Sequence, residues 1–158
     1  MLMGLTKSSV GRSAVDSGLI IKKHSPDDKV IALAGNPNVG KSTVFNALTG
    51  LNQHTGNWPG KTVSNAQGYC KTESRGLMLV DIPGTYSLMA HSAEEEVARN
   101  FICFGKPDAV AVVCDATSLE RNLNLVLQIA EISKRTVVCV NLMDEAKRKG
   151  IKIDLKRL

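Results

Sequence analysis

One short stretch combines the residue types that are needed to bind a polyphosphate. Gly35-Asn36-Pro37-Asn38-Val39-Gly40-Lys41-Ser42 matches the pattern G-x-x-x-x-G-K-[ST]. Glycines let the backbone approach the phosphates closely, because a Cβ atom would obstruct them. Lys41 would supply a positive charge for the outer phosphates, and Ser42 a hydroxyl ligand for Mg²⁺. The stretch predicts a phosphate-binding loop, and the alternative is an ordinary glycine-rich turn.

A second pattern, Asp81-Ile82-Pro83-Gly84, directly follows an apolar run. Asp81 could hold Mg²⁺ through a water molecule, and the amide of Gly84 could meet the terminal phosphate. The alternative is a proline turn without a ligand. Thr62 lies in the polar stretch between Ser42 and Asp81. Its hydroxyl could complete the Mg²⁺ shell and be released on hydrolysis, although a solvent-facing threonine is the alternative.

A third pattern, Asn141-Leu142-Met143-Asp144, has the chemistry to recognise guanine. The carboxylate of Asp144 can accept hydrogen bonds from N1–H and the exocyclic N2–H of guanine. Adenine lacks this pair of donors, so ATP would leave the carboxylate desolvated and unpaired. Asn141 would face the other edge of the purine and brace the phosphate loop. Helix capping is the alternative role for this pattern.

Alternation of apolar runs with amphipathic stretches predicts an α/β fold with a mostly parallel, doubly wound sheet and helices on both faces. Ligands of such sheets bind at the carboxyl ends of the strands, which is where all three patterns fall. The predicted strands cover residues 30–34, 66–72, 77–81, 109–114 and 136–140. Residues 51–65 are polar and predict a long loop.

Three helices are predicted, each with an apolar face. The first begins at about Lys41 and ends at Gly50, with Val44, Phe45 and Leu48 inward. The second covers residues 93–104, with inward-facing Val97, Phe101 and Phe104. The third is capped by Ser118, and its apolar stripe consists of Leu119, Leu123, Val126, Leu127 and Ala130.

Bulk properties agree with one globular domain of 158 residues, 43% hydrophobic and 22% charged. We expect residues 1–28 to form a flexible N-terminal extension and residues 29–158 to form the domain. The net charge of +5 suits phosphates, nucleic acid or an anionic membrane, but solvated surface lysines are the favoured explanation. The four cysteines form no C-x-x-C pair and are expected to be reduced core thiols: Cys70, Cys103, Cys114 and Cys139. The longest apolar run, residues 109–114, is too short to span a membrane, which predicts a soluble chain.

The ordered patterns, with Thr62 between them, resemble the signature of translation-factor-type GTPases. Further stretches resemble the N-terminal G domain of FeoB-type ferrous iron transporters over about residues 29–150. These stretches are Asn-Ala-Leu-Thr-Gly at 46–50, Gly-Asn-Trp-Pro-Gly-Lys-Thr-Val at 56–63, and Asp-Ile-Pro-Gly-Thr-Tyr-Ser-Leu at 81–88. Gly-Asn-Trp-Pro-Gly is the most specific to that family.

The resemblance implies a P-loop NTPase fold of the small-GTPase type and hydrolysis of GTP to GDP and phosphate. It assigns catalysis to Asn38, Lys41, Thr62 and Gly84, and guanine binding to Asn141 and Asp144. It assigns phosphate binding to Gly35, Asn36, Pro37, Asn38, Val39, Gly40, Lys41, Ser42 and Thr43. Mg²⁺ would be held by Ser42, Thr62 and, through water, Asp81. Asn38 would help to hold K⁺ beside the phosphates, with loop bracing as the alternative.

Departures from the usual GTPase pattern have expected consequences. Thr85 stands where many GTPases place a water-orienting glutamine, so backbone groups and the Thr62 loop would position the water and turnover would be slow. Leu142 replaces the usual lysine of the base motif, which implies faster nucleotide exchange. The acidic residues 94–96 are interpreted as first-turn helix residues rather than iron ligands.

The resemblance also implies a context for the chain. A transmembrane iron-permease domain and a small cytosolic Feo accessory protein would be its partners, at the inner face of a bacterial membrane, and no nucleic acid is expected. The sequence has no counterpart of the final strand, the last base-contacting loop or the last helix, which predicts a C-terminally truncated G domain. Two alternatives stay open: an RNA-linked GTPase of the ribosome-assembly type, and a truncated G domain that binds nucleotide without hydrolysing it.

Overall fold

The computed structural model describes residues 18–50 and 53–158 of the chain. Its elements, in chain order, are β1 (Lys29–Gly35), α2 (Lys41–Thr49), β2 (Gln53–Asn57), β3 (Ser64–Lys71), β4 (Gly76–Asp81), α3 (Ala93–Phe104), β5 (Ala109–Asp115), a 3-10 turn (Ala116–Ser118), α4 (Leu119–Ile132), β6 (Thr136–Asn141) and α5 (Met143–Arg148). The predicted strands and helices are all present, with ends shifted by a few residues.

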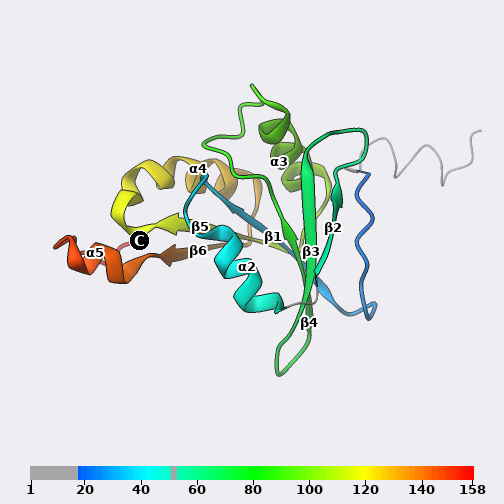
Figure 1. The fold of residues 1–158 in the computed structure, drawn as a ribbon, viewed down its shortest axis with the longest axis horizontal. Helices are drawn as coiled ribbons and strands as arrows, with labels where there is room; N and C mark the ends of the chain where they lie inside the picture. Colours follow the sequence, from blue (N-terminus) through cyan, green and yellow to red (C-terminus); the bar gives the residue numbers. More distant parts are fainter. Residues whose placement is uncertain (1–17, 51–52) are drawn as a thin grey trace, which may run out of the picture.

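The strands form one sheet in the order β2-β3-β4-β1-β5-β6 (Figure 1). Strand β1 is parallel to β4 and β5, and β5 is parallel to β6, whereas β3 is antiparallel to both β2 and β4. The register pairs Leu33 with Asp81 and Asp115 with Asn141, so the carboxyl ends of the parallel strands lie at one edge of the sheet. The fold is therefore the predicted mostly parallel α/β sheet.

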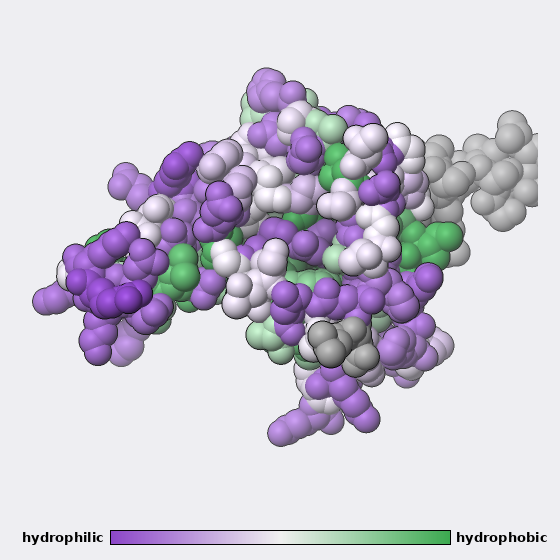
Figure 2. Space-filling view, viewed as in Figure 1, coloured by the Kyte–Doolittle hydropathy of each residue, from purple (hydrophilic) through white to green (hydrophobic). Residues whose placement is uncertain are grey.

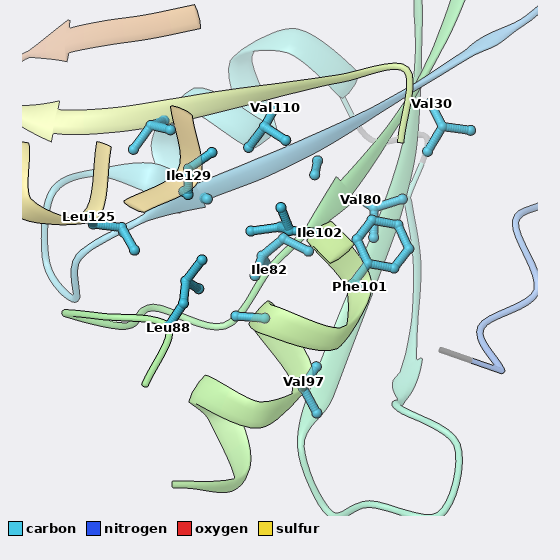
Figure 3. Close-up of a cluster of buried hydrophobic side chains, with 14 of the residues drawn as sticks. Val30, Val80, Ile82, Leu88, Val97, Phe101, Ile102, Val110, Leu125 and Ile129 are labelled. Atoms are coloured by element: carbon cyan, nitrogen blue, oxygen red, sulfur yellow. The ribbon is translucent and has the colours of Figure 1, made fainter. Parts of the chain in front are cut away.

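Two hydrophobic clusters hold helices against the two faces of the sheet. The larger one joins α3 and α4 to the sheet, with Phe101 and Ile129 among its fully buried side chains (Figure 3). The smaller one lies under α2, where Phe45 packs with Leu33 and Val113. Burial of a large apolar side chain contributes on the order of 2 kcal/mol, so these two interfaces fix where each helix lies. Helices on both faces were predicted and are confirmed.

The predicted helix faces were wrong in detail. Leu48, Phe104 and Leu127 are 47–65% exposed, and Ala130 is exposed as well. Of the stripe predicted for α4, Val126 is buried, and Leu119 and Leu123 are half-buried against the core. The other buried residues of α4 are Asn122, Leu125 and Ile129. Its sequence is apolar at so many positions that several stripes fit a helical period, and the apolar pattern could not choose between them.

Asn122 explains which face of α4 turns inward. Its Oδ1 accepts a hydrogen bond from the Asp115 amide at 3.3 Å, and its Nδ2 donates to the Ser118 carbonyl at 2.8 Å. The buried amide is therefore paired in both directions, as a buried polar group must be. Ser118 stands at the N-cap position, but its side chain makes no capping bond, so the predicted cap was wrong. The carboxylate of Asp115 accepts from the Thr117 amide at the start of the preceding turn instead.

Part of the predicted 51–65 loop is a strand. Residues Gln53–Asn57 form β2, which pairs antiparallel with β3 at the edge of the sheet. This strand is polar and largely exposed, so it carries no apolar alternation that could have revealed it. The chain then turns over Trp58 to Val63, where the Trp58 amide donates to the Val63 carbonyl at 2.8 Å. The Trp58 ring is buried and meets Phe101 edge to face at 5.3 Å.

The remaining predictions about the chain concern its surface, its thiols and its N-terminal part. Hydrophilic residues predominate on the face shown in Figure 2. No helix of the described ranges is both long and apolar enough to cross a membrane. All four cysteines are free thiols, and burial raises the pKa of Cys114 to about 11. The extension predicted over residues 1–28 lies outside the described residues as far as residue 17, and the division into extension and domain stays a prediction.

Candidate functional site

The loop between β1 and α2 surrounds a hollow of about 420 Å³ at the carboxyl edge of the sheet. Its lining comes from the predicted phosphate loop and from the second pattern: Asn36, Pro37, Asn38, Gly40, Lys41, Ser42 and Gly84. Two sequence patterns that are far apart in the chain thus meet at one cavity. A larger hollow of about 840 Å³, between the start of α4 and residues 151–158, shares no lining residue with it.

The shape of this loop depends on unusual backbone angles and on close packing. Asn38 has φ 63° and Gly40 has φ 82°, both in the left-handed region that non-glycine residues rarely adopt. A Cβ atom on Gly40 would overlap the side-chain amide of Asn141, and one on Gly35 would lie 2.7 Å from the Val113 carbonyl oxygen. Val39 is 3% exposed and packs into the cluster under α2. The glycines are needed to fit the loop against the protein itself.

Replacing Gly40 with alanine is expected to lower the free energy of unfolding by about 2–4 kcal/mol, because backbone strain and overlap with Asn141 act together. Gly150 is a matched control, since it also has a positive φ (71°) but nothing lies within 4 Å of the place of its Cβ atom. Gly150→Ala should therefore cost only the backbone strain, about 1 kcal/mol. Urea unfolding of the two variants checks this, and equal losses would contradict the role assigned to the Asn141 contact.

Lys41 and Asp81 form an ion pair at the floor of the hollow. The ammonium Nζ of Lys41 donates to Oδ1 of Asp81, and the Lys41 side chain is only 10% exposed. The two residues meet because β1 and β4 are adjacent parallel strands. A cation this sheltered interacts strongly with an anion that enters the hollow, since little water screens it. The site can therefore bind phosphate oxygens and offer a carboxylate beside them.

The segment after β4 is held against the phosphate loop. The amide of Thr85 donates to the Gly35 carbonyl at 3.1 Å, and a Cβ atom on Gly84 would lie 3.2 Å from Pro37 Cα. Thr85 is 5% exposed and does not line the hollow. Further along, the Leu88 amide donates to Gln128 Oε1 at 2.7 Å, which ties this segment to α4. A buried Thr85 agrees with the expectation that its side chain does not orient water.

The third pattern reaches the phosphate loop through Asn141. Its Nδ2 donates to the Val39 carbonyl at 3.0 Å, so the asparagine braces the loop as expected. Asp144 follows in the first turn of α5, and its side chain is 82% exposed and pairs with Arg148 at 3.6 Å. Neither side chain caps α5, because the N-cap residue is Leu142 with φ 61° and no capping bond. The Asp144 carboxylate is open to accept hydrogen bonds from a ligand.

Thr62 is exposed and does not line the hollow. It lies in the turn between Trp58 and Val63, which is anchored by the buried Trp58 ring and by an ion pair of 2.9 Å between Lys61 and Glu96. The hydrogen bond and positive charge of Lys61 lower the pKa of Glu96. The structure thus brings together the phosphate loop, Asp81, Gly84 and Asn141, and leaves Thr62 apart from them.

The acidic residues at the start of α3 have structural partners. The Glu95 amide donates to Ser92 Oγ at 3.1 Å, and Glu95 Oε2 accepts from the His91 amide at 2.9 Å. The first bond caps α3 at Ser92, and the second ties the residue before the cap to the same first turn. Among the described residues no group of three or more His, Cys, Asp and Glu side chains could hold a metal ion. The interpretation of residues 94–96 as first-turn helix residues is supported by these bonds.

Sequence reasoning missed the burial of Asn36. This residue is 4% exposed, and its Oδ1 has no hydrogen-bond partner among the described residues. The pattern marks the position as variable, so nothing in the sequence distinguishes a buried amide there from an exposed one. Because an unpaired buried oxygen is costly, it indicates a residue set close to the ligand space of the loop.

Comparison with known proteins places this site in context. Residues 29–158 match the family model FeoB_N, described as ferrous iron transport protein B. The Fe(2+) transporter FeoB of Methanocaldococcus jannaschii is 55% identical over 102 residues, which cover 65% of this chain and 15% of that protein. The Fe(2+) transporter FeoB of Escherichia coli K12 is 43% identical over 132 residues, which cover 81% and 17%. The chain thus spans about a sixth of the length of these relatives.

Solved structures show the same fold. The G domain of the T. maritima FeoB iron transporter superposes with a TM-score of 0.77 at 41% identity, covering 82% of this chain and 79% of that one. The cytosolic domain of the same transporter in its GMPPNP form gives a TM-score of 0.77 at 44% identity, covering 80% and 50%. The cytosolic domain of L. pneumophila FeoB gives 0.78 at 43% identity, covering 81% and 51%.

Proposed function

Because the chain belongs to the family of the N-terminal domain of ferrous iron transport protein B, we propose that it binds and hydrolyses GTP as the nucleotide module of a ferrous iron uptake system. One observation carries the proposal. The sheltered ammonium of Lys41 lies in a hollow walled by the phosphate loop and Gly84. Related cytosolic domains have been solved in GDP and GMPPNP forms, which supports guanine nucleotide as the ligand.

Nucleotide binding is assigned to two parts of the site. The backbone of residues 35–43 and the Lys41 ammonium would hold the phosphates, with help from the positive N-terminal end of α2. Asp144 would accept hydrogen bonds from N1–H and N2–H of guanine. Asn141 would hold the phosphate loop in a fixed position relative to the base. The 3.0 Å bond from Asn141 to Val39 supports this link, because it joins the base motif directly to the loop.

The residues present fit a Mg²⁺ ion. Ser42 and Gly84 line the same hollow, and Asp81 borders it through its pair with Lys41. Hydroxyl and carboxylate oxygens are the ligands that this hard cation prefers, and it commonly keeps several waters and substrate phosphates in its shell. Ser42 would ligate the ion directly and Asp81 through water. When bound, the ion would neutralise charge that develops on the phosphates.

Switching would involve the Trp58–Val63 turn and the segment that carries Gly84. Thr62 is exposed in the structure, so it would have to move toward the phosphates to complete the Mg²⁺ shell. Hydrolysis would remove the γ-phosphate contact and release the Trp58–Val63 turn, as in other order–disorder switches. The Gly84 amide would contact the γ-phosphate from the other side. Since Thr85 is buried, the attacking water would be oriented by backbone groups of these segments.

Asn38 is proposed to help hold K⁺ beside the β- and γ-phosphates. Its left-handed backbone places it on the wall of the hollow, where its side chain is free of hydrogen bonds to other described residues and is exposed. A fixed monovalent cation would offset developing negative charge in the way that an arginine finger does.

We therefore expect single-turnover GTP hydrolysis with Mg²⁺ to be about tenfold or more faster in K⁺ than in Na⁺ at equal ionic strength. Asn38→Ala should abolish this difference, whereas Asn124→Ala, at an exposed position on α4, should keep it. Equal rates in the two salts would remove K⁺ from the proposal. GTP binding without any hydrolysis would favour the binding-only alternative, and salt-sensitive RNA retention would favour the RNA-linked one.

The transporter context is part of the same proposal. The relatives named as Fe(2+) transporters are several times longer than this chain. We infer that the chain works with a transmembrane permease domain, and with a small Feo accessory protein, at the inner face of the cell membrane. Substituting residues 29–158 for the matching region of the E. coli transporter tests this. Ferrous iron uptake by the chimera would support the role, and loss of uptake despite retained GTP hydrolysis would contradict it.

A further inference from the structure

Residues 18–25, which precede β1, are bound to the face of β3. The side chain of Gln67 on β3 holds the backbone of this segment in both directions. Its Oε1 accepts from the Lys22 amide at 3.3 Å, and its Nε2 donates to the Ile20 carbonyl at 2.9 Å. Gln67 is itself only 6% exposed. The buried side-chain amide thus bonds one backbone N–H and one backbone carbonyl of the segment, as a neighbouring strand would. These two bonds fix the position of residues 20–22 along β3.

A second anchor lies at the other end of the segment. The His24 ring stacks on Tyr69 of β3, with centroids 4.0 Å apart. Asp28 is 3% exposed, and its carboxylate accepts from the amides of His24 and Ser25 at 2.9 and 2.8 Å. A buried carboxylate with two backbone donors is well satisfied, so this turn is a defined structure. In Figure 1 the segment is the blue trace that runs beside β2 and β3.

The N-terminal end of the segment lies beside the turn that carries Thr62. Gly18 is next to Pro59, since a Cβ atom built on Gly18 would fall 3.4 Å from the Cβ atom of Pro59. Leu19 and Ile21 pack against the large cluster, whose members include Trp58 and Val63, the two ends of the turn. The same segment therefore lies against β3 and, at Gly18, beside the turn.

We propose that residues 18–25 form a strap that positions the Trp58–Val63 turn and limits its movement. The family match begins at residue 29, so the strap is an addition to the matched region. The turn is otherwise held by the buried Trp58 ring and by the exposed Lys61–Glu96 ion pair, and exposed pairs contribute little. The strap lies beside Pro59 of the same turn. Because Thr62 lies outside the hollow, a strap that restrains the turn would oppose the movement of Thr62 toward the phosphates, a step that rests on the function proposed above.

Hydrogen exchange in the 158-residue chain, without added nucleotide, tests the strap directly. Two amides of the turn report on its opening: Trp58 donates to Val63, and Lys61 donates to Trp58 at 3.0 Å. Gln67→Ala removes both side-chain bonds to the strap, and we expect the exchange of these two amides to become about tenfold faster.

Gln53→Ala is the matched control. Gln53 lies on β2, next to β3, and its side chain also makes several hydrogen bonds, but to Asn46, Thr49 and Gly50 beside α2. It should leave the exchange of the turn unchanged. A second pair of variants avoids any change to the sheet: deleting residues 1–22 removes most of the strap, whereas deleting residues 1–17 spares it. Only the longer deletion should speed exchange at Trp58 and Lys61.

The outcomes separate the strap from the proposed function. Unchanged exchange of the turn in both Gln67→Ala and the longer deletion would overturn the strap, whether or not the chain binds GTP. Faster exchange in both, with the two controls unchanged, would support it. If the parent chain showed this pattern but failed to bind GTP, the proposed function would fail and the strap would stand. Equal acceleration by the two deletions would also overturn the assignment to residues 18–22.

Discussion

Replacing Lys41 with alanine is expected to weaken GTP binding by more than about 100-fold, a loss of about 3 kcal/mol. The reason is that the Lys41 side chain is only 10% exposed, so the attraction of its charge to phosphate oxygens is poorly screened. The variant also leaves Asp81 without its partner, and an uncompensated carboxylate beside the hollow would repel the phosphates. Titration calorimetry with GTP and Mg²⁺ at constant salt measures the effect.

Lys29 provides the matched control for this experiment. Lys29 is the first residue of β1 and pairs with Asp108 at 3.6 Å, with 42% of its side chain exposed. Lys29→Ala removes the same charge from the chain, and GTP affinity should change by less than about twofold because exposed charges are screened. The urea midpoint of each variant shows whether it is folded. A folded Lys41→Ala variant that binds GTP within tenfold of the parent would refute the phosphate role of the ammonium.

The second large effect is expected at the base. Asp144→Asn should lower the affinity for GTP by roughly 100-fold or more, because an amide group offers only one acceptor to the two donors of guanine. The same variant should gain affinity for xanthosine triphosphate. Xanthine keeps N1–H but carries a carbonyl at C2, so it matches the acceptor and the donor of an asparagine amide. Competition between GTP and xanthosine triphosphate, for the parent and for the variant, measures whether the preference for GTP is reversed.

Asp154→Asn is the control for the base experiment. Asp154 is an exposed aspartate near the end of the described chain, with Arg157 at 3.5 Å as its partner. Its replacement removes the same charge without touching the Asn141–Asp144 segment, so the preference for GTP should stay. If Asp144→Asn still bound GTP in preference to xanthosine triphosphate, the Asp144 carboxylate would not be the group that recognises the base.

Much of the frame around the site could be predicted from local patterns. Val30 to Ala34 is an apolar run that ends at Gly35, and a helix follows at Lys41, as the structure shows. Such a run indicates a strand that is buried on both faces. Helices cover both faces of a parallel sheet, so its strands carry this pattern in their own sequence. The ends of β4 and β6 likewise carry the second and third patterns, because parallel strands leave their loops at one edge.

Other elements could not be predicted, for physical reasons that differ between them. Strand β2 forms through backbone hydrogen bonds to β3 while its side chains stay in solvent, so its sequence lacks apolar alternation. The inward face of α4 depends on Asn122, whose two bonds lie to backbone groups at the end of β5 and in the turn before the helix. A polar residue at a core position is stabilised by its partners, and a single sequence does not show those partners.

The chain's residues show which chemical groups are available and which of them end strands. Which groups meet is settled by the fold: Lys41 pairs with Asp81 40 residues away, and Asn141 bonds to Val39 across 102 residues. These contacts follow from strand order and register, which are settled by packing over the whole sheet. The same packing leaves Thr62 on a turn outside the hollow and lays residues 18–25 against β3. Residue spacing along the chain does not specify which of these groups come into contact, because the contacts depend on how separate segments pack around one core.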